Sequence, residues 1–217
     1  MSGATFSAGD ILRTAAAIAR RRLALIAATY LVLAGGGFAV DGGFLSQAAQ
    51  TPANFILTIA TLVLSYVLMR RALDDLGGST PGHGGGGAFV LVGIVWTAGV
   101  GLALLLLVVP GIVLLVRWSA ATPILLDEPV GVIESLQESW ARTAGHAVPI
   151  AVSLVAAWGP VVASIVAATL LELQFSSTSA ALLISLALPL SQIAGWYVAL
   201  AIHQLTRSNR ALAEVFA

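Results

Sequence analysis

The sequence contains no cysteine and no lysine, and it carries little charge of either sign. The lack of cysteine excludes disulfides, thiolate catalysis and cysteine metal sites. The lack of lysine excludes Schiff-base chemistry and the lysine of a phosphate-binding loop. Ten basic residues, all arginine, balance ten acids, so the chain has no net field to attract nucleic acid. We therefore expect no nucleic-acid partner.

Apolar residues dominate what is present. They make up 59% of the 217 residues, and charged residues make up 9%, against about 25% in a typical soluble domain. A membrane-spanning helix needs about 20 mostly apolar residues. Six apolar runs approach or exceed this length, all uncharged except the fourth, which is short and contains Arg117: Leu23–Val40, Ala53–Met69, Ala88–Val109, Ile112–Leu126, Ala147–Leu171 and Ala180–Leu205. The fold class predicted is an all-α integral membrane protein with six transmembrane helices, in which residues 1–217 form a single membrane domain.

The arginines predict the orientation of these spans. If the N-terminus lies inside, nine arginines are cytoplasmic and the three outer loops contain none: Arg13, Arg20, Arg21, Arg22, Arg70, Arg71, Arg142, Arg207 and Arg210. Cytoplasmic loops of multi-pass proteins are enriched in arginine and lysine. Both termini are therefore expected on the cytoplasmic side.

Proline and glycine mark turns and kinks. Pro110 and Gly111 separate the third and fourth runs and predict a tight outer hairpin. Pro123, Pro160 and Pro189 lie within runs, where a proline frees a backbone carbonyl and kinks the helix. Serine side chains and Gln192 are available as partners: Ser153, Ser164, Ser185 and Ser191. Because discontinuous helices build the sites of many transporters, a small-solute transporter or channel subunit is the alternative function.

Three segments are expected on the cytoplasmic side. Residues 1–22 predict an amphipathic helix with a capping box of Ser7 and Asp10. Residues 77–87, GGSTPGHGGGG, predict a flexible linker. Residues 127–146 predict an amphipathic connector, which either lies at the lipid headgroups or docks a partner. Its apolar face is expected to hold Val132, Ile133, Leu136 and Trp140.

Arg117 is the one arginine predicted inside a span. It lies six residues after Gly111, about 9 Å along a helix, where facing lipid costs roughly 2.5–3.5 kcal/mol. One interpretation is that Arg117 snorkels outward or pairs structurally with Glu172. Our hypothesis is that it is buried and paired with an acid, and Asp41 and Glu172 are the acids nearest that boundary. The alternative role is binding an anionic headgroup or substrate.

No catalytic pattern is evident. The three histidines, His83, His146 and His203, are far apart in the sequence, and no hydrolase or metalloprotease motif occurs. Asp127, Glu128 and Glu134 read as a solvated, helix-capping turn rather than a magnesium site. We therefore expect no enzyme activity, metal or cofactor, with an intramembrane lipid-modifying enzyme as a third possibility. The small residues Gly93, Thr97 and Gly101 predict close helix packing, within the bundle or in a homo-oligomer.

The region 109–146 resembles the membrane domain family of glycerophosphodiester phosphodiesterases, and residues 6–25 resemble its first helix. The matching positions are Pro110, Gly111, Arg117, Trp118, Ser119, Pro123, Glu128, Gly131, Ser139, Thr143, Gly145 and His146. The chain has no phosphodiesterase barrel, so no catalytic residue is carried over. The glycine run also replaces the basic helix that the family has after the second span.

The resemblance implies a multi-pass protein of the bacterial cytoplasmic (inner) membrane. Its implied partners are membrane lipids and a possible partner membrane protein or lipid enzyme. Our leading hypothesis is a non-catalytic membrane scaffold or lipid-interacting module. The candidate ligand or headgroup residues are Arg117, Trp118, Glu128, Ser139 and Thr143.

Overall fold

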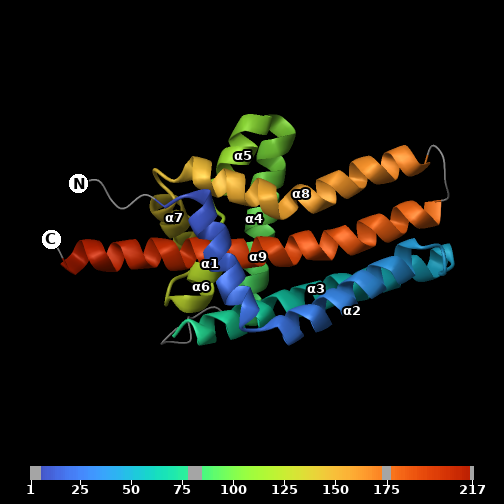
Figure 1. Ribbon diagram of the computed structural model, residues 1–217, viewed down its shortest axis with the longest axis horizontal. Coiled ribbons are helices and arrows are strands. Elements are labelled where there is room, and N and C mark those ends of the chain that lie inside the picture. Colours follow the sequence, from blue (N-terminus) through green and yellow to red (C-terminus); the bar gives the residue numbers. More distant parts are fainter. Residues whose placement is uncertain (1–5, 78–84, 173–176, 216–217) are drawn as a thin grey trace. The chain divides into compact units, whose positions relative to one another are not determined.

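The computed structural model describes the backbone of residues 6–77, 85–172 and 177–215. It describes the side chains of the same residues, apart from those of residues 171, 172, 177 and 209–215. Figure 1 labels the helices of this part of the chain. Their bounds are α1 Ala8–Arg20, α2 Leu23–Asp41, α3 Gln47–Asp75, α4 Gly86–Leu106, α5 Val108–Arg117, α6 Ala121–Asp127, α7 Val132–Arg142, α8 Ala147–Glu172 and α9 Ser177–Val215.

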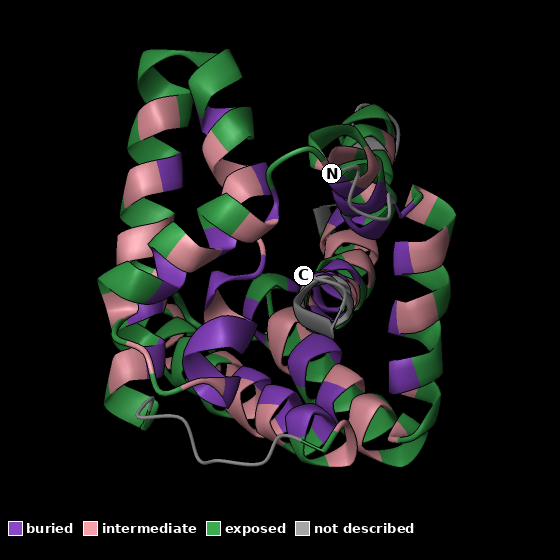
Figure 2. Ribbon diagram, turned by 90° about the vertical axis from the view of Figure 1, so that its left-hand side faces the viewer, coloured by how far each residue is buried: buried purple, intermediate pink, exposed green. Residues whose placement is uncertain are grey.

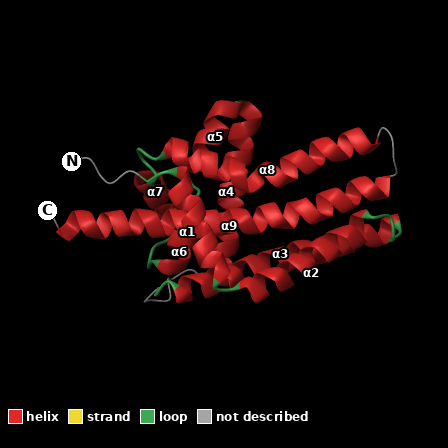
Figure 3. Cartoon of the chain, in the orientation of Figure 1, coloured by secondary structure: helices red, strands yellow, loops and turns green. Residues whose placement is uncertain are grey.

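Six stretches are long and apolar enough to cross a membrane: Leu23–Asp41, Gln47–Asp75, Gly86–Leu106, Val108–Asp127, Ala147–Leu170 and Thr178–Ser208. The long helices carry buried residues along one side and exposed residues along the other (Figure 2). In α8, for example, Ile150, Ala157 and Val161 are buried, whereas Val155 and Val162 are exposed. Exposed valines suit a side that faces lipid. The predicted multi-pass, all-α membrane protein is confirmed, and its described elements are all helical (Figure 3).

The chain divides into two compact units. The first unit comprises Met1–Ile18, Met69–Leu154 and Tyr197–Ala217, and the second comprises Ala19–Leu68 and Val155–Trp196. Helices α4 to α7 belong to the first unit and α2 to the second, while α3, α8 and α9 contribute residues to both. The single membrane domain expected from the sequence stays a prediction.

The predicted hairpin between the third and fourth spans is present, but the chain reverses at another residue. Leu107, with an extended backbone (φ -155, ψ 127), separates α4 from α5. Pro110 lies in the first turn of α5, where its missing N–H costs no helical bond. Gly111 faces Leu104 so closely that a Cβ atom would clash. The turn predicted at Pro110 and Gly111 was therefore wrong in position: the proline starts a helix, and the glycine permits α5 to approach α4.

The prolines of the later spans lie inside helices. Pro160 and Pro189 lie within the continuous helices α8 and α9, and Pro123 lies in the first turn of α6. Ser191 contacts the backbone beside Pro160, but as an acceptor rather than as the expected donor to a freed carbonyl: the Val161 N–H donates to Ser191 Oγ at 3.2 Å. Ser153 instead donates to the Pro149 carbonyl of its own helix. The kinks themselves stay predictions.

The N-terminal amphipathic helix is confirmed as α1. The backbone N–H and hydroxyl of Ser7 donate to Asp10 Oδ2 at 2.8 and 2.7 Å, and the Asp10 N–H donates to Ser7 Oγ at 3.2 Å. This is the predicted capping box. Ile11, Ala15 and Ile18 form its buried side. Of the predicted linker 77–87, residues 78–84, which include His83, lie outside the described residues.

Candidate functional site

The fourth span is broken, and the break lies in the first unit. Helix α5 ends at Arg117, three residues form a turn, and α6 begins at Ala121. Such a break leaves carbonyls of one helix and N–H groups of the next without helical partners. Ser139 of α7 supplies both, because its hydroxyl donates to the Arg117 carbonyl at 2.7 Å and accepts from the Ala120 N–H at 3.2 Å. The serine thus replaces the missing helical bonds.

Helix α7 packs against the broken span through small hydroxyl side chains. Ser135, Leu136 and Ser139 are its buried residues, and Thr143, which follows it, is also buried. The Thr143 hydroxyl donates to the Ser139 carbonyl at 2.8 Å. Of the predicted apolar face, Leu136 is buried, whereas Ile133 and Trp140 are 58% and 43% exposed. An apolar side that faces lipid is exposed in this way, so the location of α7 at the lipid headgroups or against a partner stays a prediction.

Arg117 is partly exposed rather than buried. Its guanidinium carbon lies 5.3 Å from the centre of the Trp140 ring, and its Nη1 donates to the Trp140 carbonyl at 3.4 Å. Arginine over an indole face is favourable by about 0.5–1 kcal/mol at an exposed site. Among the side chains that the structure describes, none provides a carboxylate partner for Arg117. The predicted burial was therefore wrong, and the side chain of Glu172, one proposed partner, lies outside the described residues.

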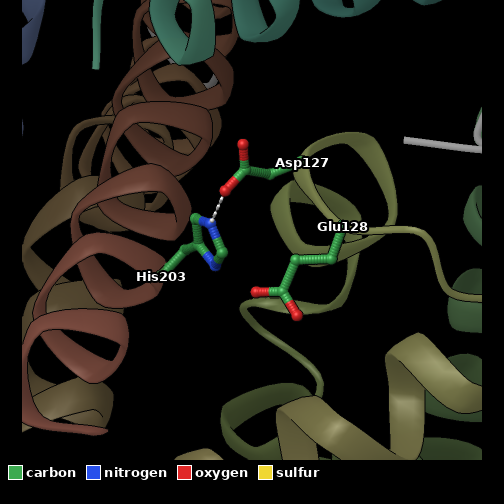
Figure 4. A group of neighbouring side chains, drawn as sticks. All are labelled: Asp127, Glu128 and His203. Atoms are coloured by element: carbon green, nitrogen blue, oxygen red, sulfur yellow. Dashed lines mark hydrogen bonds and ion pairs between the residues drawn. The ribbon is translucent and has the colours of Figure 1, made fainter. Parts of the chain in front are cut away.

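Two acids at the end of α6 organise a network of ion pairs (Figure 4). Asp127 Oδ2 lies 2.9 Å from His203 Nε2 and 2.7 Å from Arg207 Nη1, both on α9. One residue earlier, the Leu126 carbonyl accepts from Arg70 Nη1 of α3 at 2.9 Å. Asp127 is 7% exposed. The prediction of a solvated turn was wrong at this residue, because a histidine and an arginine replace water around its carboxylate.

Glu128 forms the second half of the network. Both of its carboxylate oxygens accept from Arg142, at 2.7 and 2.6 Å, and Arg142 Nε also donates to Glu138 at 2.9 Å. The predicted pair of Glu138 and Arg142 is confirmed. Burial lowers the pKa of Arg142, but the hydrogen bonds to Glu128 and Glu138 outweigh it, so this pKa is raised above its ordinary value. Glu128 thus anchors α7 to the end of α6.

Three of these side chains could also meet at a metal ion. Asp127, Glu128 and His203 each offer a ligand atom, and the three atoms lie within 4.8 Å of one another. However, Arg142 and Arg207 already hold carboxylate oxygens of this group. The guanidinium charges compensate the acids, so little negative charge is left to attract a divalent cation. The ion pairs account for the cluster, and the expected absence of a metal stays a prediction.

Of the charged residues among the five candidates, Glu128 pairs with Arg142, whereas Arg117 has no carboxylate partner among the described side chains. Ser139 and Thr143 bond backbone carbonyls, and the Trp118 ring lies against Gly99. The sequence reasoning missed Trp140 as the partner of Arg117, and His203 and Arg207 as partners of Asp127. The spacing of His203 and Arg207, four residues apart near the C-terminal end of the last span, was the available signal, since residues i and i+4 share a helix face.

A pocket lies in the second unit. Its volume is about 220 Å³, and residues of α2, α3 and α9 line it. Its polar lining residues are Asp41, Asn54, Thr58, Thr61, Ser185 and Gln192, and Pro189 also contacts it. The sequence had singled out Ser185, Pro189 and Gln192 as neighbours at a kink. It did not predict that residues from the C-terminal end of α2 and the N-terminal half of α3 would join them.

Comparison with known proteins gives no relative: no family model, no curated protein and no solved structure matches the chain. The resemblance to the phosphodiesterase membrane domains therefore stays a prediction.

Proposed function

We propose that the protein is a non-catalytic, lipid-interacting membrane protein in which Arg117 binds an anionic lipid headgroup. The observation that carries this proposal is the position of Arg117, partly exposed beside an exposed tryptophan and without a carboxylate partner among the described side chains. A cation next to an amphipathic indole ring suits the boundary between headgroups and acyl chains. Exposed Ile133, on the same helix as Trp140, adds apolar surface for the acyl chains.

The wider setting follows from the same proposal. We place the protein in the cytoplasmic membrane of a bacterium, as the resemblance to phosphodiesterase membrane domains implies. A contact with lipid agrees with that resemblance. It also leaves room for a scaffold that presents a partner membrane protein or a lipid enzyme. In this scheme the ion-pair network of Asp127 and Glu128 keeps α6 and α7 in place, so that Arg117 and Trp140 are held together.

Native mass spectrometry of the protein from vesicles of phosphatidylglycerol and phosphatidylcholine tests the proposal. Wild type is expected to retain phosphatidylglycerol preferentially. Arg117→Ala should weaken retention about fivefold, since one arginine near an anionic surface contributes about 1 kcal/mol. Arg71→Ala is the matched control, because Arg71 is an exposed arginine at the inner end of α3. Equal losses in both variants would indicate diffuse attraction and contradict a site at Arg117.

A small-solute transporter or channel subunit is the second candidate. The polar pocket beside Pro189 supports it, because ionisable and polar groups within a membrane domain usually line a substrate path. Uptake of radiolabelled or fluorescent solutes into proteoliposomes tests this function. The third candidate, an intramembrane lipid-modifying enzyme, gains no support from the pocket, since Asp41 is the one titratable residue among its described lining.

A further inference from the structure

The pocket of the second unit is lined by the Asp41 carboxylate, by three hydroxyls, and by the side-chain amides of Asn54 and Gln192. Thr58 and Thr61 both use their hydroxyl protons within α3, donating to the Asn54 carbonyl at 2.9 Å and the Leu57 carbonyl at 2.8 Å. A hydroxyl has one proton and two lone pairs. What these threonines offer a ligand is therefore acceptor capacity, and the carboxylate of Asp41 is an acceptor as well.

Ser185 adds acceptors from the opposite side. It is 5% exposed, lines the pocket, and its hydroxyl oxygen has no hydrogen-bond partner among the described residues. Pro189, four residues later in α9, has no N–H to donate to the Ser185 carbonyl. The Ser185 hydroxyl thus has both its proton and its lone pairs available to a ligand. A ligand with N–H donors would give this buried oxygen the hydrogen bond that it lacks.

Charge and size narrow the class of ligand. Asp41 is the one charged residue among the described lining, which includes no arginine, so a cation is favoured over an anion. A volume of about 220 Å³ corresponds to roughly seven waters, more than a bare metal ion fills. A primary ammonium group has three N–H donors, and a short carbon chain can lie against Leu33, Leu57 and Ile184.

We propose that this pocket binds a small primary-ammonium solute, with the ammonium group between Asp41, Thr58 and Ser185. This assignment goes beyond the lipid contact at Arg117, which lies in the other unit. The proposal names a ligand for the second candidate function, a small-solute transporter or channel subunit. It does not require transport, because binding is measured in detergent, where no flux occurs.

The experiment is a titration of the purified protein with propylammonium chloride, followed by the melting temperature Tm and by calorimetry. Sodium chloride, 1-propanol and sodium propionate, at matched concentration, are the comparison solutes. Propylammonium alone is expected to raise Tm saturably. Asp41→Asn should weaken binding at least tenfold, because hydrogen bonds to charged groups contribute about 1.5–3 kcal/mol. Thr58→Val should weaken it severalfold, and both positions are exposed enough to keep the fold.

Thr169→Val is the matched control. Thr169 is an exposed threonine of α8 that donates to the Ile165 carbonyl at 2.9 Å, as Thr58 does within α3, but it does not line the pocket. The affinity of the Thr169→Val variant for propylammonium should equal that of wild type. The proposal is overturned if sodium chloride gives the same saturable shift, if Asp41→Asn binds as tightly as wild type, or if Thr169→Val loses as much as Thr58→Val.

Discussion

Arg142 shows how one side chain can hold two helices. It is 8% exposed and bonds Glu128 through two nitrogens and Glu138 through the third. A bidentate guanidinium pair fixes both distance and plane, which a lysine could not do. Removal of the Arg142 guanidinium leaves the carboxylates of Glu128 and Glu138 without their shared cation, although both carboxylates are partly shielded from water.

We therefore expect Arg142→Gln to lower the free energy of unfolding by about 3 kcal/mol, the lower end of the range for a broken buried ion pair, because Glu128 is 23% exposed. Thermal denaturation in detergent measures the loss. The control is Arg13→Gln, whose exposed pair with Asp10 should contribute under about 1 kcal/mol. Similar losses in the two variants would show that burial does not strengthen the Arg142 pairs.

At the scale of elements, the break in the fourth span depends on a hydroxyl from another helix. Ser139→Ala leaves the Ala120 N–H unpaired, and leaves the Arg117 carbonyl with the Thr143 hydroxyl, at 3.3 Å, as its remaining partner among the described residues, at a cost of about 1–3 kcal/mol. The loss should appear as a lower Tm and as faster hydrogen exchange at Ala120. Ser208→Ala is the control, since exposed Ser208 bonds only its own helix at Gln204. Unchanged exchange at Ala120 would argue against this bridging role of Ser139.

The capping box of α1 predicts a pH dependence. The Ser7 hydroxyl, and then its backbone N–H, hold the pKa of Asp10 below its ordinary value of 3.8. The folded pKa is the lower one, so the contribution of Asp10 is fully present above pH 3.8 and is lost as the pH falls through the folded value. Amide exchange in the first turn of α1 should rise in that window. Asp10→Asn should flatten this rise, and an identical rise in the variant would assign it to another group.

At the scale of the whole molecule, hydropathy predicts the spans well because burial in lipid decides them. The local details that sequence missed depend on packing between elements. At the hairpin, the chain reverses at Leu107, and Gly111 packs closely against Leu104. The buried face of α7 holds Ser139 because the helix breaks after Arg117. The partners of Asp127 lie 76 and 80 residues along the chain, and no local period shows such a pairing.

The absence of cysteine makes topology directly measurable. Each introduced cysteine is the sole thiol of the chain. Ser46→Cys, between α2 and α3, and Ala144→Cys, after α7, are both at exposed positions. If the arginine distribution sets the orientation, a membrane-impermeant maleimide should label position 46 from outside and position 144 only after the inner face is opened. Labelling of both from one side would contradict the predicted orientation.

The sequence distance between Asp127 and its partners has a consequence for biosynthesis. At about 5–20 residues per second, Asp127 waits roughly 4–16 seconds after its own synthesis before its hydrogen-bond partners His203 and Arg207 exist. Throughout that interval the carboxylate at the C-terminal end of the fourth span lacks both partners, and the first unit lacks its last segment. The nascent chain must therefore either keep this end in the aqueous headgroup layer or be sheltered by the insertion machinery until α9 arrives. A ribosome stalled before residue 203 would trap that intermediate.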